Sequence, residues 1–218
     1  MTIDCVCELL GVIYMTNKDL SLNPIIKKAA FDEFMKFGYR DASINRIAKN
    51  ANVTTGALYT RYKCKDELFR SFFSEFAVQV QSFNSDLYEL YNKALMSKEF
   101  DDFYFALKTE ILVQLDFLFK YYDEFTLLLC KSEGSSVCEG IDAWMLKKVE
   151  STYSFMQTIS GNEIDKNLIE VLLYQQLSVI KFILEKGYSK DKATSFFADV
   201  NLFYKAGWGN FFKTIKEK

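Results

Sequence analysis

One proline, Pro24, interrupts a chain of 218 residues, so long stretches of backbone are free to continue as helix. Apolar residues recur at the three- and four-residue spacing of amphipathic helices, whereas runs in which Val, Ile or Thr alternate with polar residues are scarce. Half of the residues are hydrophobic, which is enough to bury a substantial core. The sequence therefore predicts an all-α fold of long helices and short connections.

The chain contains no histidine, and this restricts its chemistry. The absence removes the commonest general base, the commonest metal ligand and every Ser-His or Cys-His nucleophile pair. No carboxylate motif with metal-ligand spacing replaces them, so an enzyme built on a helical bundle is the disfavoured alternative. We expect no enzymatic activity, no catalytic residues, no metal site and no cofactor.

The cysteines indicate a reducing compartment. They are odd in number and lack paired C-x-x-C spacing, which favours neither a zinc site nor a disulfide framework: Cys5, Cys7, Cys64, Cys130 and Cys138. No apolar run reaches the roughly 18 to 20 residues that a membrane span needs. We therefore expect a cytoplasmic protein that has no membrane partner.

Residues 1–14 stand apart from the rest of the chain. Met15 begins the more ordinary start MTNKDLSLNP, so one hypothesis is that residues 1–14 are a mis-annotated start and that translation begins at Met15. The alternative is a short extra helix with Val6, Leu9, Leu10 and Ile13 on one face.

Charge is distributed unevenly along the chain. Residues 25–70 hold ten Lys or Arg against five Asp or Glu, whereas residues 71–218 hold sixteen against twenty-one. A basic segment on an acidic body is typical of a chain that contacts a polyanion at one end, although a solvated helix face would look similar.

The basic segment contains two very short helical patterns. Ser43 can cap a helix in which Ile44, Ile47 and Ala48 face inward, and Asn50 to Val53 then interrupt the pattern. Thr54 can cap a second helix, which Leu58 anchors to the same core. Because helices of two turns are unstable alone, both must pack on the preceding helix. That helix carries Phe34 and Phe37 on its apolar face and ends at Gly38. Two short helices joined by such a turn form a helix-turn-helix, whose second helix can enter the DNA major groove.

Several residues of this segment are placed to contact DNA. With Leu58 turned inward, the exposed face of the second helix presents Thr55, Gly56, Tyr59 and Thr60. Lys63 and Lys65 follow at the start of the next helix, where free amide groups and the helix dipole favour a phosphate. We expect that helix to continue without a break beyond Phe76. Ser43 and Thr54 are capping residues whose helix starts can also lie against a phosphate.

The stretch IIKKAAFDEFMKFGYRDASINRIAKNANVTTGALYTRYKCKDELF resembles the N-terminal DNA-binding domain of the tetracycline-repressor (TetR) family of bacterial transcription regulators. The resemblance rests on the helix ending in FGY, the S-I-x-x-I-A helix, the A-N-V-T turn, and the G-A-L-Y and K-x-K-D-E-L motifs. It implies that Tyr59 and Lys65 hold phosphates, and that Thr55, Gly56 and Arg61 contact bases or backbone. Cys64 and Lys63 depart from the family, which usually has small polar residues and proline there.

Helix boundaries can also be predicted beyond the basic segment. KSEGSS at residues 131–136 breaks the helical pattern, Asn162 can cap the following helix, Gly187 ends that helix, and Ser189 caps the last one.

The resemblance also implies a helical C-terminal domain that dimerises through its last two helices and encloses an inducer pocket. The final helix carries Ala206, Gly207 and Gly209 among Phe203, Trp208, Phe211 and Phe212, and small residues allow another helix to approach closely. A pocket for an apolar or aromatic effector could use the aromatic and polar residues of the central helices, although aromatic stripes are more often plain core. The candidate residues are Phe103, Asp116, Phe117, Tyr121, Phe125, Trp144, Phe155, Tyr174 and Gln175.

The sequence thus predicts a helix-turn-helix DNA-binding domain over residues 15–70 and a helical ligand-binding and dimerisation domain over residues 71–218. The predicted function is transcription regulation by a homodimeric repressor that a small molecule releases from a palindromic operator in double-stranded DNA. A nucleoid-associated or cell-division DNA-binding protein of the same fold is the alternative. Oxidation of Cys64 between two lysines is a further, weaker hypothesis.

Overall fold

A computed structural model describes residues 23–83, 113–160 and 164–216. Within these ranges the chain forms helices and connecting turns and contains no strand, which confirms the predicted all-α fold. The described residues fall into two compact units, each treated by itself below. The first comprises residues 23–83 and 121–142, and the second comprises residues 113–120, 143–160 and 164–216.

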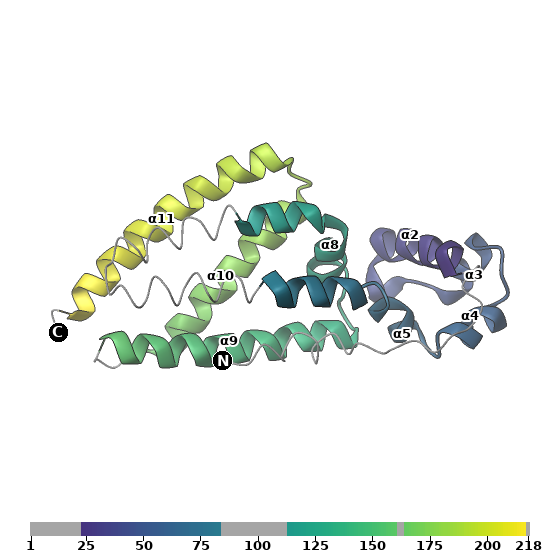
Figure 1. Ribbon diagram of the computed structural model, residues 1–218, viewed down its shortest axis with the longest axis horizontal. Helices are drawn as coiled ribbons and strands as arrows, with labels where there is room; N and C mark the ends of the chain where they lie inside the picture. Colours follow the sequence, from purple (N-terminus) through teal and green to yellow (C-terminus); the bar gives the residue numbers. More distant parts are fainter. Residues whose placement is uncertain (1–22, 84–112, 161–163, 217–218) are drawn as a thin grey trace. The chain divides into compact units, whose positions relative to one another are not determined.

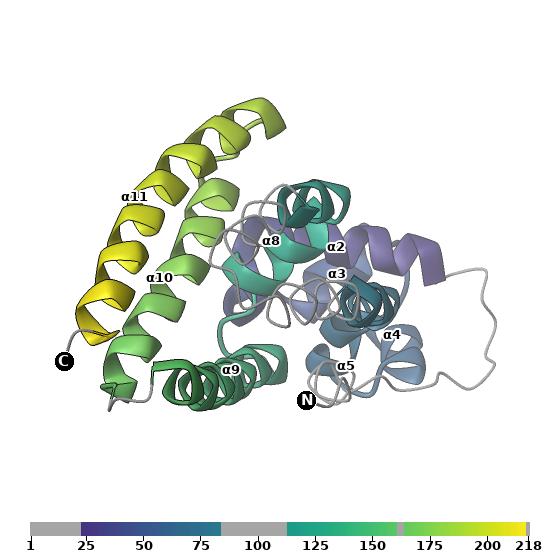
Figure 2. The ribbon, with the colours of Figure 1, turned by 60° about the vertical axis from the view of Figure 1, so that its left-hand side comes forward.

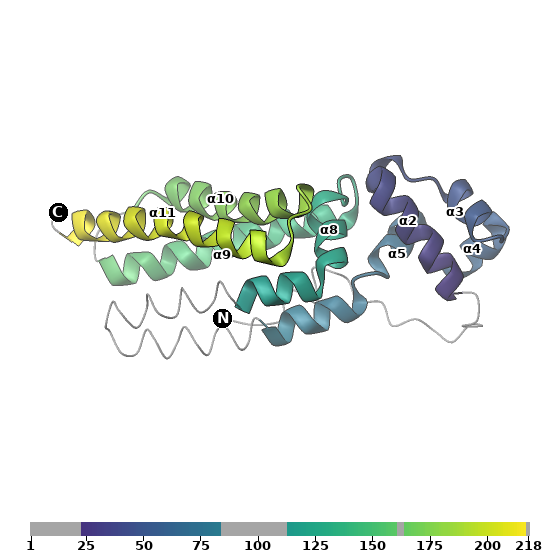
Figure 3. The same cartoon turned by 90° about the horizontal axis from the view of Figure 1, so that it is seen from above.

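Four helices at the start of the first unit form a compact head (Figure 1). They are α2 (Asn23–Asp41), α3 (Ile44–Asn50), α4 (Thr55–Arg61) and α5 (Lys65–Arg70). Figure 3 shows α2 lying across the head, with α3 and α4 next to each other at its far end. Pro24 lies in the first turn of α2, where its missing N–H costs no helical hydrogen bond.

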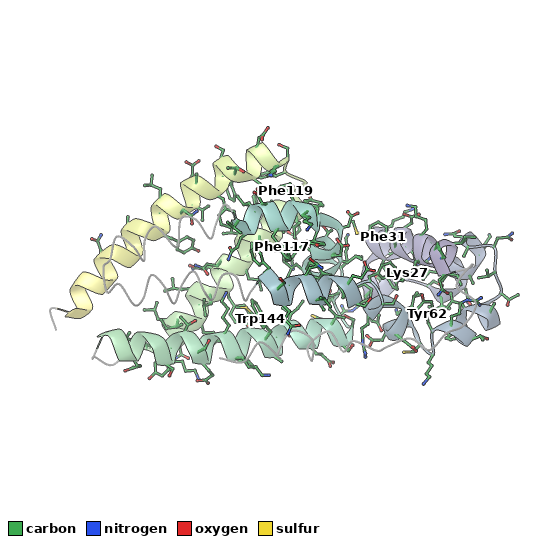
Figure 4. The ribbon with its side chains drawn as sticks, in the orientation of Figure 1. Lys27, Phe31, Tyr62, Phe117, Phe119 and Trp144 are labelled. Atoms are coloured by element: carbon green, nitrogen blue, oxygen red, sulfur yellow. The ribbon has the colours of Figure 1, made fainter. Side chains whose placement is uncertain are left out.

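The core of the head is apolar and rich in aromatic residues. Ile47 of α3 and Leu58 of α4 are fully buried, as the inward stripes predicted. The Phe34 ring of α2 meets the Phe69 ring of α5 edge to face at 4.9 Å between centroids. Tyr62, directly after α4, is 1% exposed; Figure 4 labels it together with Lys27 and Phe31 of α2. Since α3 and α4 have only seven residues each, this shared core must hold them.

The turn between α3 and α4 is closed by the backbone. The Val53 N–H donates to the Ala48 carbonyl at 3.0 Å, and the Asn52 N–H donates to the Lys49 carbonyl at 3.1 Å. These two bonds form a Schellman motif, which requires a left-handed residue at Asn52. Its φ is 54°, and asparagine tolerates this conformation better than residues with branched side chains do. The sequence A-N-V therefore fixes the angle at which α4 leaves α3.

A buried ion pair joins α2 to α3. The Glu33 side chain is 2% exposed, and its Oε1 accepts the Arg46 Nε–H at 2.7 Å and the Ser43 N–H at 2.8 Å. The guanidinium of Arg46 also lies over the Phe37 ring, 4.5 Å from its centroid. Phe37 was expected on the inward face of its helix, and this was wrong, because its side chain is 40% exposed and covered by Arg46 instead.

The helix after Cys64 was expected to run without a break beyond Phe76, and this was also wrong. It stops at Arg70, and a new helical segment begins at residue 74. The Ser71 carbonyl points out of the helix and accepts the Lys27 ammonium at 2.9 Å. Burial lowers the pKa of Lys27, against the opposing effect of Glu75. The break is thus bonded to a lysine 44 residues earlier in the chain, a contact that helical periodicity cannot detect.

The rest of the first unit is α8 (Tyr122–Cys130) and the start of α9 (Ser136–Ser160). The Phe76 ring packs on Phe125 at 4.9 Å and on Tyr121 at 5.6 Å between centroids. The predicted break in KSEGSS is confirmed, since residues 131–135 connect the two helices. We call residues 131–136 the α8–α9 loop, counting the first residue of α9.

The second unit contains the larger part of α9, then α10 (Lys166–Glu185) and α11 (Lys190–Lys216). Figure 2 shows α10 and α11 side by side, and Phe182 stacks on Phe196 near their junction at 5.7 Å between centroids. As predicted, α10 ends at Gly187, whose φ is 59°, and Ser189 caps α11 by accepting the Lys192 N–H at 3.3 Å. Asp165, rather than Asn162, is the N-cap of α10.

Helix α10 is unusually apolar for its exposure. By length and composition alone it could cross a membrane, with a mean hydropathy of 1.3, although only 17% of the apolar window is buried. Its apolar residues do not form one uninterrupted run, because Tyr174, Gln175 and Gln176 divide them. Neighbouring exposed apolar side chains are Val171 and Phe182 on α10 and Leu202 and Phe203 on α11.

Replacing Asn52 tests the turn between α3 and α4. Asn52→Ala should lower the free energy of unfolding by about 1 kcal/mol, because alanine resists the left-handed conformation. Asn52→Gly should change it by no more than a few tenths of a kcal/mol. Urea denaturation measures both, with Asn45→Ala as the control at an exposed helical position of α3. Equal losses for Asn52→Ala and Asn45→Ala would contradict this account of the turn.

The ion pair between α2 and α3 predicts that removing its cation costs more unfolding free energy than removing the charge of its carboxylate. Arg46→Met leaves the buried Glu33 carboxylate without its cation and should cost about 3 kcal/mol. Glu33→Gln should cost only about 1 to 2 kcal/mol, because Arg46 is half exposed and can recover water. Lys28→Met, which breaks the exposed pair with Asp32, is the control and should change the unfolding free energy by less than about 0.5 kcal/mol. The reverse order of the first two losses would show that the pair is not the stabilising contact.

Candidate DNA-binding surface

Helix α4 presents a polar surface opposite its buried Leu58. Thr54 is the N-cap, and its Oγ1 accepts the Ala57 N–H at 3.1 Å. Gly56, Tyr59 and Thr60 are exposed, Tyr59 by 49%, and Thr55 is half-buried. The Thr60 hydroxyl donates to the Gly56 carbonyl at 2.9 Å. The residues expected on the reading face therefore lie together on one short helix.

Gly56 is not required by packing inside the head. A Cβ atom built there would meet only Thr54 Oγ1, at the ordinary contact distance of 3.9 Å. Glycine in a helix costs about 1 kcal/mol relative to alanine. The protein thus accepts a weaker helix at a position where its own fold leaves room for a side chain, and this is consistent with close approach of a partner.

Ser43 and Arg61 flank this surface. Ser43 is the N-cap of α3, and its Oγ accepts the Arg46 N–H at 3.5 Å. The Arg61 Nη1 donates to the Ala57 carbonyl at 3.1 Å, and Nε has no partner among the described residues. Arg61 is half-buried at the end of α4, so part of its guanidinium retains hydrogen-bonding capacity.

The two lysines at the start of α5 differ in where their side chains point and in what their ammonium groups contact. Lys63 is exposed, and its backbone N–H donates to Glu67 Oε2 at 2.6 Å. Cys64 between them is exposed and caps α5, with its sulfur accepting the Glu67 N–H at 3.4 Å. The Lys65 ammonium turns inward and bonds the carbonyls of Tyr39, Arg40 and Ala42. Of these two lysines, Lys63 alone extends its ammonium from the head surface.

Residues 39–42, which we call the 39–42 corner, connect the end of α2 to α3 and contact the α8–α9 loop. The Tyr39 N–H donates to the Lys131 carbonyl at 2.7 Å. Arg40 pairs with Glu133 at 2.8 Å. Burial, followed in size by the charge of Asp66, raises the pKa of Tyr39 to about 12. The ring below the Lys65 ammonium is therefore neutral at physiological pH.

Asp66 adds another contact between α5 and the α8–α9 loop. Its carboxylate accepts the Ser136 hydroxyl at 2.6 Å and the Ser136 N–H at 3.0 Å. The negative charge lies at the start of α9, where the helix dipole favours it. Sequence reasoning treated Asp66 only as part of a motif, because its partner is 70 residues away.

The structure does not bring the predicted effector residues together in one unit. Tyr121 and Phe125 pack on Phe76 in the first unit. Four other candidates belong to the second unit: Phe117, Trp144, Tyr174 and Gln175. Gln175 is exposed and the other three are half-buried. Figure 4 labels Phe117 and Trp144. Asp116 is 70% exposed and pairs with Lys190 at 2.9 Å. Phe103 and the side chain of Phe155 lie outside the described residues.

No metal-binding chemistry was found in the part of the chain that the structure describes. A search of those residues finds no group of three or more histidine, cysteine, aspartate or glutamate side chains able to hold an ion.

A family of known proteins matches the head of this chain. The profile of the family described as "Bacterial regulatory proteins, tetR family" matches residues 26–72. An uncharacterized HTH-type transcriptional regulator, YhgD, of Bacillus subtilis (strain 168) is 42% identical over 50 residues. That stretch is 23% of this chain and 26% of the relative, so the chain matches about a quarter of the relative's length.

Two solved structures resemble the chain more distantly. A TetR-like transcriptional regulator from Rhodococcus sp. RHA1 has a TM-score of 0.49 and 16% identity, covering 90% of this chain and 98% of the other. FadR from Bacillus subtilis, in complex with stearoyl-CoA, has the same TM-score and identity, covering 79% and 94%. At this level of likeness neither says what this chain binds.

The family match falls on the helices that carry the exposed surface of α4. The same residues form a helix-turn-helix with its capping residues, its left-handed turn and its buried Leu58. Residues 26–72 therefore match the N-terminal domain of the tetR family of bacterial regulatory proteins.

Proposed function

We propose that the chain is a transcription regulator that binds a specific DNA operator and represses transcription until a small molecule releases it. The observation that carries the proposal is the polar face of α4, where Gly56, Tyr59 and Thr60 are exposed and Thr55 is half-buried. A helix of this kind reads base edges in the major groove, and phosphate contacts orient it. Lys63 and the capped starts of α3 and α4 can supply those phosphate contacts.

Footprinting on the DNA flanking its own gene tests the proposal, at physiological salt and in excess competitor DNA. The expected result is a protected, roughly palindromic site. Affinity for that site should exceed affinity for unrelated DNA by at least about 1,000-fold. Weak protection of all sequences, which fades as salt rises, would contradict it and favour a nucleoid-associated protein.

The repressor should act as a homodimer. Two recognition helices must reach successive major grooves about 34 to 36 Å apart, which one head cannot do. In the single chain, α10 and α11 leave Val171, Leu202 and Phe203 exposed, the last by 78%. Gly207 of α11 is surrounded by open space, so another helix could approach closely there. A second copy would cover this apolar surface.

Release by an effector requires unequal binding. A small molecule shifts the equilibrium only if it binds the conformation that does not bind DNA more tightly than the one that does. Linkage then demands that operator DNA weaken effector binding by the same factor. Titration of the effector with and without operator, followed by tryptophan fluorescence, would measure that factor. Equal effector affinities in the two titrations would refute release by this effector.

Gly56→Ala should separate stability from DNA binding. The new methyl group has room in the free protein and improves helix propensity, so the unfolding free energy should rise by up to about 1 kcal/mol. Operator affinity should fall at least tenfold if the backbone of Gly56 lies close to DNA. Denaturation and quantitative gel shift measure the two effects. Unchanged affinity would show that this position does not approach DNA closely.

Phe203→Glu should disrupt the dimer. Placing a carboxylate in a buried apolar interface is strongly unfavourable, so sedimentation should show a monomer at concentrations where the wild type is dimeric. Operator affinity should fall as well, because one head contacts only one half-site. Leu146→Glu on α9 is the control, since Leu146 is also exposed, by 57%. A dimeric Phe203→Glu variant would exclude this part of α11 from the interface.

A further inference from the structure

Lys65 uses its entire hydrogen-bonding capacity inside the head. Its ammonium has three N–H donors and no acceptor. Nζ lies 2.8 Å from the Tyr39 carbonyl, 3.2 Å from the Arg40 carbonyl and 3.3 Å from the Ala42 carbonyl. It also lies over the Tyr39 ring, 4.5 Å from the centroid. To bind a phosphate, Lys65 would have to give up one or more of these bonds.

The 39–42 corner has a physical need for such a cation. Gly38, with φ 72° and ψ 170°, breaks the helical path of α2, so the carbonyls that follow lose regular helical partners. The carbonyls at a helix end also carry partial negative charge, which an ammonium stabilises. The one remaining carbonyl of the corner, that of Asp41, accepts Arg46 Nη2 at 2.8 Å. Lys65 and Arg46 together therefore bond all four carbonyls.

The corner also determines where the helix-turn-helix begins. Ala42 is 7% exposed, and the next residue, Ser43, is the N-cap of α3. Helix α3 leads through the Asn52 turn directly into α4. A shift of the 39–42 corner must therefore move the start of α3 and, with it, the reading face of α4.

Lys63 provides the contrast, only two residues earlier. Its side chain is exposed, and no hydrogen bond or ion pair of its ammonium occurs within the described residues. It can reach a phosphate without breaking an internal contact. The two lysines, equal in charge and two residues apart in sequence, thus have different environments.

We propose that Lys65 is a positioning residue of the DNA-reading surface, which holds the 39–42 corner by its carbonyls and does not contact a phosphate. This inference rests on the proposed function, because positioning has meaning only if α4 reads DNA. It assigns the phosphate contact at the start of α5 to Lys63.

The experiment compares Lys65→Met, Lys65→Arg and Lys63→Met with the wild type. Each protein is melted without DNA, and its operator affinity is measured over a series of salt concentrations at a temperature where it is folded. Loss of one phosphate contact lowers the slope of log affinity against log salt by about 0.9, whereas loss of positioning does not. Salt dependence is therefore the readout that a merely structural role would leave unchanged.

For Lys63→Met we expect a lower salt slope and an unchanged melting temperature. For Lys65→Met we expect the melting temperature to fall by roughly 5 °C or more. Its operator affinity should fall at least tenfold, with the wild-type salt slope. Lys65→Arg should recover most of both losses, because arginine keeps the cation and its donors.

Two results would overturn the proposal about Lys65, and a third would show that the proposed function itself fails. A lower salt slope with an unchanged melting temperature in Lys65→Met would make Lys65 a phosphate contact and overturn the proposal. A lower melting temperature with wild-type operator affinity would also overturn it, because the corner would then not control the reading face. If the wild type itself binds no operator, the proposed function fails and this inference falls with it, whatever the melting temperatures.

Discussion

The geometry of the head depends on how its chain turns between α2 and α3. Gly38 ends the regular part of α2, and the four carbonyls that follow are held by two cations, Lys65 from α5 and Arg46 from α3. Arg46 is in turn held by the buried carboxylate of Glu33. A backbone corner with unsatisfied carbonyls would be costly in a partly buried place. These contacts therefore fix the start of α3, and α4 follows through a turn whose shape Asn52 dictates.

The 39–42 corner also contacts the α8–α9 loop. Tyr39 and Arg40 bond Lys131 and Glu133, while Asp66 bonds Ser136. The first unit is thus more than a DNA-binding head with a helix attached. Its short helices are held by contacts with residues more than 60 positions later, so α8 and the first turn of α9 support the surface that α4 presents.

Much of this structure could be predicted from sequence, because many of its signals are local. Ser43, Thr54 and Ser189 mark helix starts and Gly187 marks a helix end, since capping needs only a few neighbouring residues. The exposed face of α4 followed from the inward position of Leu58. The contacts that sequence reasoning missed join distant residues: Lys27 with Ser71, Lys65 with the 39–42 corner, and Asp66 with Ser136. Periodicity places Lys65 at a helix start but cannot show that its ammonium turns inward.

Selection of binding sites from a pool of random duplex DNA tests the central claim most directly, that this chain reads a specific sequence. The account predicts enrichment of one two-fold symmetric motif whose half-sites are centred about one helical turn, or a multiple of it, apart. Affinity for that motif should exceed affinity for the unselected pool by several orders of magnitude. A pool that remains diverse after repeated selection, bound through salt-dependent contacts alone, would contradict the account.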